Sequence, residues 1–345
     1  MTHGRSASRV IATLLKSPEP SIRWKTRVGV LGEERDSKAI RRLEEEILRS
    51  TRVRALLSRR DPPGRPGTAR QVYHKWQGPH WVLAHLADLG YPRGDESLHR
   101  VRDRVLDYWL SPNFFREFEA RTKVESYRQE GVPVLAGRYR RCASQQGNAL
   151  YSTITLGIAD ERADPLVEGL LRWQWPDGGW NCDRNPAAGT SSFTESLLPM
   201  VGLAAYAAAR KSRTVANAVN RASEVFLRRR LFRRATDGSL IHRDFAVLHY
   251  PLYWHYDFLG GLKAMAYVGR IRDSRCAEPL DLLEQQQLPE GGWPAVKRFY
   301  KVSPRAMAPN SDSVNWGGTS LRRMNPWVTA DALAVLRSAG RIDGG

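Results

Sequence analysis

Cysteine is scarce in this chain. Of the 345 residues, only Cys142, Cys182 and Cys276 carry a thiol. Three thiols cannot all pair, which excludes a fold held together by a disulfide framework and favours a reducing compartment. Hydrophobic residues make up 41% of the chain, which is enough for a large core and excludes a disordered polymer. The thiols are therefore expected to be free or bound to a metal.

Long hydrophobic runs are lacking as well. No stretch of about 18 or more apolar residues occurs, so the sequence offers no membrane-spanning helix. The apolar segment near the N-terminus, in MTHGRSASRVIATLLKSPEP, is too short and too interrupted for a secretory signal. We therefore expect a soluble, cytoplasmic protein.

Strand signals are also few. Alternating β-branched runs are rare, whereas apolar segments of helical length, separated by Gly and Pro turns, recur throughout. The predicted fold class is all-α. Five of these segments are rich in small residues, and their starts are spaced by roughly the length of an outer and inner helix pair. We expect a ring of inner helices enclosed by outer ones, with the inner helices at about residues 80–89, 143–159, 191–210, 256–269 and 327–339.

Acidic residues are outnumbered by basic ones. There are 36 Asp and Glu against 54 Lys and Arg, a net charge of +18, and residues 1–70 hold 17 basic against 8 acidic side chains. With the Pro- and Gly-rich loop Asp61–Thr68, this predicts a basic N-terminal helical appendage, residues 1–66, before a main domain, residues 67–345. Such charge attracts a nucleic acid, an anionic lipid surface or a diphosphate-bearing substrate. The same excess of basic residues is equally typical of the solvated surface of an Arg-rich protein.

Two segments of the main domain repeat each other. Residues 170–180 read LLRWQWPDGGW and residues 283–293 read LEQQQLPEGGW, so both fit Leu-x3-Gln-x-Pro-(Asp/Glu)-Gly-Gly-Trp, 113 residues apart. The pattern predicts a buried helix that ends in a turn, where glycine supplies a positive φ. The tryptophan is expected to fold back over the turn, and the glutamine amide to bond open backbone groups at the helix end.

These segments resemble the Gln-x3-Gly-x-Trp repeats of the α/α-toroid superfamily of squalene and terpenoid cyclases and protein prenyltransferase β-subunits. The matching residues are Gln174, Gly178 and Trp180, and Gln287, Gly291 and Trp293. The segments PEPSIRWKTRVGVLGE, DGGWNCD and YWHYDFLGGLKAM look like bacterial squalene-cyclase-like or prenyltransferase-repeat proteins, over about residues 17–339. The resemblance implies a single-barrel α/α toroid. The Asp-x-Asp-Asp acid of class II cyclases and the Asp-Asp-x-x-Asp magnesium motif of class I synthases do not occur, so a conventional cyclase is not expected.

Three potential zinc ligands, Cys142, Cys182 and His255, precede expected inner-helix starts. Parallel inner helices gather their N-termini at one cavity mouth, so these side chains can converge there. Two thiolates and an imidazole, with a carboxylate or water, would form a tetrahedral zinc site in which Asp257 or Asp183 orients His255. Protein prenyltransferases and lanthionine cyclases are similar in holding zinc at helix starts, but their Asp-x-Cys pair and Cys-His dipeptide are missing here. The alternative is that both cysteines are small buried residues and His255 is a core histidine.

Aromatic and acidic side chains near the helix starts are further candidates. In cyclases, aromatic walls guide a hydrophobic chain and stabilise carbocations; the alternative is an ordinary core role. A carboxyl facing an apolar cavity would have a raised pKa and could serve as an acid, although Glu195 equally fits a cap of its own helix. The predicted substrate-binding residues are Tyr151, Phe193, Trp254, Tyr256 and Trp327, and the predicted catalytic residues are Asp257, Asp183, Glu195 and Asp331.

We therefore expect an enzyme that acts on an isoprenoid or other hydrophobic substrate in a central cavity, with zinc as the candidate cofactor. The alternative is a non-catalytic helical scaffold or binding protein that holds an anionic partner through its basic surface.

Overall fold

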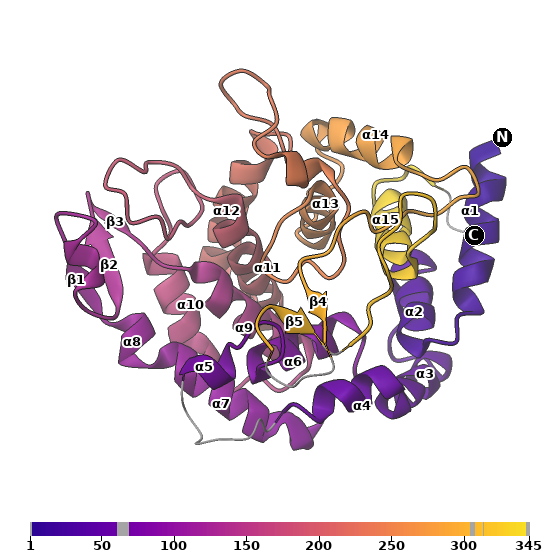
Figure 1. Ribbon diagram of the computed structural model, residues 1–345, viewed down its shortest axis with the longest axis horizontal. Coiled ribbons are helices and arrows are strands. Elements are labelled where there is room, and N and C mark those ends of the chain that lie inside the picture. The colour runs from indigo at the N-terminus through magenta and orange to yellow at the C-terminus, as the bar shows by residue number, and fades with distance from the viewer. Residues whose placement is uncertain (1, 61–68, 304–307, 313, 343–345) are drawn as a thin grey trace. The chain divides into compact units, whose positions relative to one another are not determined.

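Helices dominate the structure, a computed structural model that describes residues 2–60, 69–303, 308–312 and 314–342 (Figure 1). The all-α fold class is confirmed. The strands within these residues are short and form one three-stranded sheet, in the order β1-β2-β3, and one pair, β4-β5. Their bounds are Glu117–Glu119, Val132–Leu135, Arg138–Tyr139, Lys301–Val302 and Ser311–Asp312.

The chain packs as two compact units. Unit 1 comprises Met1–Pro62, Tyr73–Pro92 and Arg229–Gly345, and unit 2 comprises Pro63–Val72 and Arg93–Arg228. The helices of unit 1 are α1 (Thr2–Leu15), α2 (Pro20–Trp24), the π-helical turn η1 (Lys25–Val30), α3 (Lys38–Arg49), α4 (Thr51–Leu57), α6 (Pro79–Asp88), η4 (Arg243–Ala246), α13 (Phe258–Tyr267), η5 (Ser274–Cys276), α14 (Ala277–Gln285) and α15 (Pro326–Ser338).

Unit 2 contains the small sheet and the longest described helix, α11. Its helices are α5 (Ala69–Val72), η2 (Glu96–Leu98), α7 (His99–Leu110), α8 (Pro112–Phe115), η3 (Glu125–Tyr127), α9 (Ala143–Thr155), α10 (Ala163–Arg172), α11 (Phe193–Arg210) and α12 (Arg213–Leu227). The helix α11 packs against both α9 and α12, and α10 packs against α9.

The N-terminal helices belong to unit 1, together with helices from the C-terminal part of the chain, and the domain division predicted from the sequence stays a prediction. The turn η1 packs against α15, near the other end of the chain, and the Nζ atom of Lys25 lies 3.0 Å from Oδ1 of Asp331. The packing therefore joins the described helices at the start of the predicted appendage, residues 1–66, to α15 of the predicted main domain. The loop Asp61–Thr68, proposed as the boundary, lies outside the described residues.

All five helices expected to form an inner layer are present as α6, α9, α11, α13 and α15. They form because runs of small apolar residues such as VGLAAYAAA allow close packing on several sides. The closed ring predicted for them would include helices of both units and stays a prediction.

Two of these helices, α9 and α11, run parallel in close contact. Ser144, at the start of α9, hydrogen-bonds to Glu195, at the start of α11. Farther along both helices, a Cβ atom at Gly147 would lie 2.3 Å from the backbone nitrogen of Pro199, and one at Gly202 would lie 2.4 Å from the Gly147 oxygen. Only glycine allows this approach. The N-termini of α9 and α11 therefore lie at the same end of unit 2.

The two repeated turns have matching hydrogen bonds. The indole Nε1 of Trp180 donates to the Leu170 oxygen at 2.9 Å, and Nε1 of Trp293 donates to the Leu283 oxygen at 2.6 Å. The backbone nitrogens of the two tryptophans donate, each at 2.9 Å, to hydroxyls in the first turns of α11 and α15, those of Ser196 and Thr329. Each turn thus fixes the start of the helix that follows it.

Candidate functional site

Cys142 occupies the residue before α9. It follows β3 through two buried arginines, and its side chain is half-buried. The nearest backbone pairing, a parallel bridge between Arg140 and Asn181, lies beside it. Because Asn181 precedes Cys182, this bridge brings the segment with the second cysteine alongside the segment with the first.

Cys182 follows the first repeated turn by two residues, and Glu195 is the third residue of α11. The carboxylate oxygen Oε2 of Glu195 accepts hydrogen bonds from the Ser144 backbone nitrogen at 3.1 Å and from its hydroxyl at 2.8 Å. Glu195 therefore caps the neighbouring helix α9. This corrects the alternative drawn from the sequence, in which Glu195 caps its own helix.

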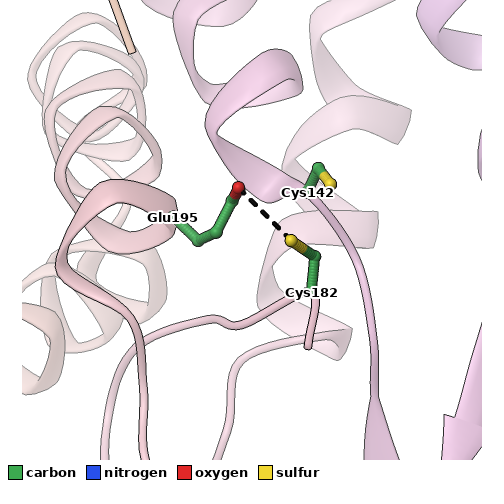
Figure 2. Close-up of side chains that lie close together, drawn as sticks. All are labelled: Cys142, Cys182 and Glu195. Atoms are coloured by element: carbon green, nitrogen blue, oxygen red, sulfur yellow. Dashed lines mark hydrogen bonds between the residues drawn. The ribbon is translucent and has the colours of Figure 1, made fainter. Parts of the chain in front are cut away.

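The three side chains converge (Figure 2). The sulfurs of Cys142 and Cys182 and a carboxylate oxygen of Glu195 all lie within 4.8 Å of one another. The Cys182 thiol donates to Oε1 of Glu195 at 3.5 Å. Figure 2 shows that the side chains come together from three different segments. The expected convergence of the two cysteines is thus seen in unit 2, with a carboxylate as the third group.

Protons are held tightly in this cluster. The hydrogen bond with Cys142, together with burial and the Glu195 carboxylate, raises the pKa of the Cys182 thiol well above its usual range. Burial also raises the pKa of Glu195, although the hydrogen bonds from Ser144 oppose that shift. A cation would have to displace the Cys182 proton to bind here.

His255, the predicted third zinc ligand, belongs to unit 1. Its ring stacks between Trp254 and Phe299, with centroid distances of 4.0 and 3.5 Å, and Nδ1 lies 3.2 Å from the Leu252 oxygen. Burial lowers the pKa of His255 to about 4, so the imidazole is neutral at neutral pH. Its assignment to the metal site stays a prediction, and the group that lies beside the two sulfurs within unit 2 is Glu195.

Asp257 and Asp183 have local structural partners. Asp257 is fully buried and caps α13, since it accepts from the Gly260 nitrogen at 2.7 Å and from the His249 nitrogen at 2.9 Å. Asp183 is exposed in the loop after Cys182 and accepts from the Asn185 nitrogen at 2.9 Å. These contacts explain the position of both carboxylates, and their catalytic roles stay predictions.

Asp331 lies in charged surroundings, not in the apolar ones expected from the sequence. Its carboxylate is 3.0 Å from Nζ of Lys25 and 2.6 Å from Nζ of Lys263. Asp88, at the end of α6, is 2.8 Å from the same Lys25 nitrogen and accepts from the Tyr250 hydroxyl at 2.7 Å. The two lysines and two aspartates form an alternating ion network, and a catalytic role of Asp331 stays a prediction.

The predicted aromatic residues are found mainly in packed positions. Tyr151 and Trp254 are half-buried, whereas the other three are buried. Phe193 packs on Phe226, Tyr256 donates to the Leu231 oxygen at 2.6 Å, and Trp327 stacks on Tyr250. Their contacts are those of core side chains, and substrate binding by the five residues stays a prediction.

Several basic side chains near the N-terminus form ion pairs with carboxylates within unit 1. Arg23 pairs with Glu46 at 2.6 Å, and Arg59 pairs with the buried Asp312 at 2.8 Å. An open groove of about 560 Å³ beside this segment is lined by arginines and glutamates together. An anionic partner for the segment stays a prediction. Of the helices within the described ranges, none is both long enough and apolar enough to cross a bilayer.

Comparisons with known proteins find distant similarity among solved structures only. No model of a known protein family matches the chain, and no curated protein matches it. A solved structure of a type II terpene cyclase from Scytonema, an alanine-substituted variant in complex with the product merosterolic acid A, shares 16% identity. The match covers 98% of this chain and 96% of that one, with a TM-score of 0.43.

Proposed function

We propose that this protein is an enzyme with a zinc site at Cys142, Cys182 and Glu195, which acts on an isoprenoid or similarly hydrophobic substrate. The observation that carries the proposal is the convergence of two sulfurs and a carboxylate oxygen within 4.8 Å. They come from three segments of unit 2 and lie at the end where α9 and α11 begin.

The donor set fits zinc. Thiolates favour zinc over magnesium or calcium, and zinc sites commonly combine sulfur with oxygen or nitrogen ligands. Zinc bonds of about 2.3 Å to sulfur and about 2.0–2.2 Å to oxygen place two tetrahedral ligands roughly 3.5 Å apart. The distance between Cys182 Sγ and Glu195 Oε1 is 3.5 Å. Three protein ligands leave one position open, as in catalytic zinc sites.

The residues around the donors would prepare them for this role. Ser144 fixes the Glu195 carboxylate with two hydrogen bonds, so one oxygen remains directed at Cys182. The Cys182 thiol would release its proton when a cation binds, because the thiolate is the ligand. A bound zinc ion would supply Lewis acidity to a group at the open position.

The substrate class rests on the resemblance to toroid enzymes and on the apolar helices next to the site. Tyr151 and Phe193 lie on α9 and α11, the same helices whose starts carry the donors. A hydrophobic chain along these helices would present its reactive end to the opening. The missing Asp-x-Asp-Asp and Asp-Asp-x-x-Asp motifs indicate a reaction other than conventional terpenoid cyclisation.

Elemental analysis of purified protein, before and after dialysis with zinc, tests the proposal. We expect about one zinc per chain in the wild type, and loss of zinc in Cys142→Ala, Cys182→Ala and Glu195→Ala. Cys276→Ala is the matched control, because this buried thiol lies in unit 1 and should not affect binding.

The same series settles the role of His255. Full zinc content in His255→Ala would leave Glu195 as the third ligand, whereas loss of zinc would support the imidazole. A wild type that binds no zinc, or Cys142 and Cys182 variants that keep it, would overturn the proposed site.

A further inference from the structure

Arg141 is a buried arginine beside the three donors. It immediately precedes Cys142, and only 6% of its surface is exposed. Within the described part of the chain, its guanidinium forms no ion pair with a carboxylate and is held by neutral groups. Nε donates to Gln146 Oε1 at 2.9 Å, and Nη2 donates to Gln145 Oε1 at 3.1 Å. These bonds fix the position of the guanidinium but leave its charge uncompensated.

The guanidinium is tied to the segment that carries Cys142, because Arg141 precedes this cysteine and bonds Gln145 in the first turn of α9. Cys142, Glu195 and Cys182 all interact with Arg141 electrostatically and oppose the effect of burial, which lowers the pKa of the arginine. The guanidinium also lies near aromatic rings, with Cζ 4.9 Å from the Phe114 centroid and 5.8 Å from a Trp109 centroid. A buried charge without a counterion is costly, so its location calls for an anionic neighbour.

The charge count at the proposed zinc site supplies that neighbour. Zinc carries two positive charges, whereas two thiolates and a carboxylate carry three negative ones, so the loaded site is left with one negative charge. We propose that Arg141 is a positioning residue of the zinc site, whose charge balances this excess and strengthens metal binding without contacting the metal. This inference rests on the proposed zinc site and adds to it the residue that sets the site's net charge.

The inference predicts that the charge of Arg141 matters more than its shape. In a competition titration with a chromophoric chelator, Arg141→Met should bind zinc about 10- to 100-fold more weakly than the wild type, the usual effect of losing a supporting group. Arg141→Lys keeps the charge and should stay within a few-fold of the wild type. Arg138→Met is the matched control, because it removes a positive charge three residues away and should have little effect.

A double-mutant cycle with Glu195 separates charge balance from packing. Glu195→Gln removes one negative charge and Arg141→Met removes one positive charge, so the double variant restores electroneutrality. It should lose less affinity than the two single losses combined. Cobalt substitution, read from the thiolate-to-cobalt absorption band, should show both sulfurs still coordinated in the Arg141 variants.

The outcomes distinguish this inference from the zinc proposal. Wild-type affinity in Arg141→Met, equal losses in the Lys and Met variants, or strictly additive losses in the cycle would overturn the role of Arg141 and leave the zinc site standing. Absence of zinc in the wild type would overturn the site itself. Folding is checked by circular dichroism. Should Arg141→Met fail to fold, Arg141→Gln takes its place, because the amide can still bond Gln145.

Discussion

The two repeated turns form the same hydrogen bonds to the helices that follow them, but the first turns of these helices carry different side chains. In unit 2, the turn that ends at Trp180 leads to α11, where Glu195 meets two thiols. In unit 1, the turn that ends at Trp293 leads to α15, where Asp331 lies between two lysines. In the described part of the chain, no Lys or Arg side chain forms an ion pair with the Glu195 carboxylate. Asp331, in contrast, belongs to an alternating network of opposite charges.

The difference shows that the repeated turn determines where the following helix begins. The side chains next to the turn determine whether the cluster there contains ion pairs or potential metal ligands. Where lysines compensate the carboxylates, as around Asp88 and Asp331, the cluster serves the stability of unit 1. Around Glu195, two thiols and a carboxylate lie close together, and these are the groups that we propose as zinc ligands. The contrast can be tested in each unit separately.

The largest effect is expected for Lys25→Met in unit 1. The Lys25 side chain is 9% exposed and pairs with both Asp88 and Asp331, so its loss removes the more buried of the two lysines that pair with these carboxylates and leaves them only the more exposed Lys263 within the described network. Breaking a buried pair in this way typically costs about 3–5 kcal/mol of unfolding free energy. Urea denaturation measures the change, with the exposed Lys301→Met as control. A cost below about 1 kcal/mol, the usual worth of a surface pair, would show that the network is not structural, and the contrast would fail.

Zinc should stabilise unit 2 and leave the ion network of unit 1 unaffected. With free zinc at about 100 times its dissociation constant, binding adds about 2.7 kcal/mol to the unfolding free energy. Thermal unfolding with zinc and with a chelator should show this gain in the wild type and in Lys25→Met. Cys142→Ala should show no gain. An equal gain in Cys142→Ala would place the zinc elsewhere.

In the zinc-free protein, the contributions of Asp88 and Glu195 to the unfolding free energy should change with pH in opposite directions. Burial alone would raise the pKa of Asp88, but Lys25 and Lys263 lower it overall, so its contribution to stability is lost as pH falls below about 3.9, the ordinary value. Burial raises the pKa of Glu195, so its contribution is present below about pH 4.3 and is lost as pH rises through the folded value.

Neutral substitutions separate these two effects. Glu195→Gln should make the zinc-free protein more stable at about pH 7, because the amide avoids a buried charge and still accepts from Ser144. Asp88→Asn should make it less stable there. Melting temperatures between about pH 3 and 8 test both expectations, and a less stable Glu195→Gln at neutral pH would contradict the first.

The smallest effect concerns the glutamines of the repeat. Nε2 of Gln174 donates to the Gly178 oxygen at 2.7 Å and to the Ala218 oxygen at 2.9 Å, which ties the turn to α12. Gln287 forms a backbone bond to Glu284, and its side chain forms none with the described residues. At about 0.5–1.5 kcal/mol per hydrogen bond, Gln174→Ala should lower the unfolding free energy measurably, and Gln287→Ala by less. Equal losses would show that the turns are more alike than their bonds indicate.

The sequence was informative where local pattern decides structure. Small-residue apolar runs predicted the five helices, because such runs cannot be solvated on any face. The proximity of Cys142 and Cys182 followed from one further assumption, that neighbouring helices share a direction. The contact between Ser144 and Glu195 confirms that assumption for α9 and α11.

Partners distant in the chain could not be predicted in this way. Lys25 and Asp331 are 306 positions apart, and no local pattern links them, so the N-terminal segment was predicted to be an appendage from its charge and from the Pro- and Gly-rich loop that follows it. Arg141 was overlooked because one arginine in a run of basic residues gives no sign that it is buried. The cap that Glu195 provides to α9 depends on the distance between two helices, which their sequences do not specify.

The contact between Gly147 and Gly202 has a consequence for how the site could evolve. Because no Cβ fits between the two backbones, a single methyl group there would act as a wedge and widen the opening where the donors meet. Substitutions at these glycines, farther along the helices than the ligands, could thus change the distances between the ligands. The ionic radius that the proposed site accepts would change with them, although every ligand stays the same.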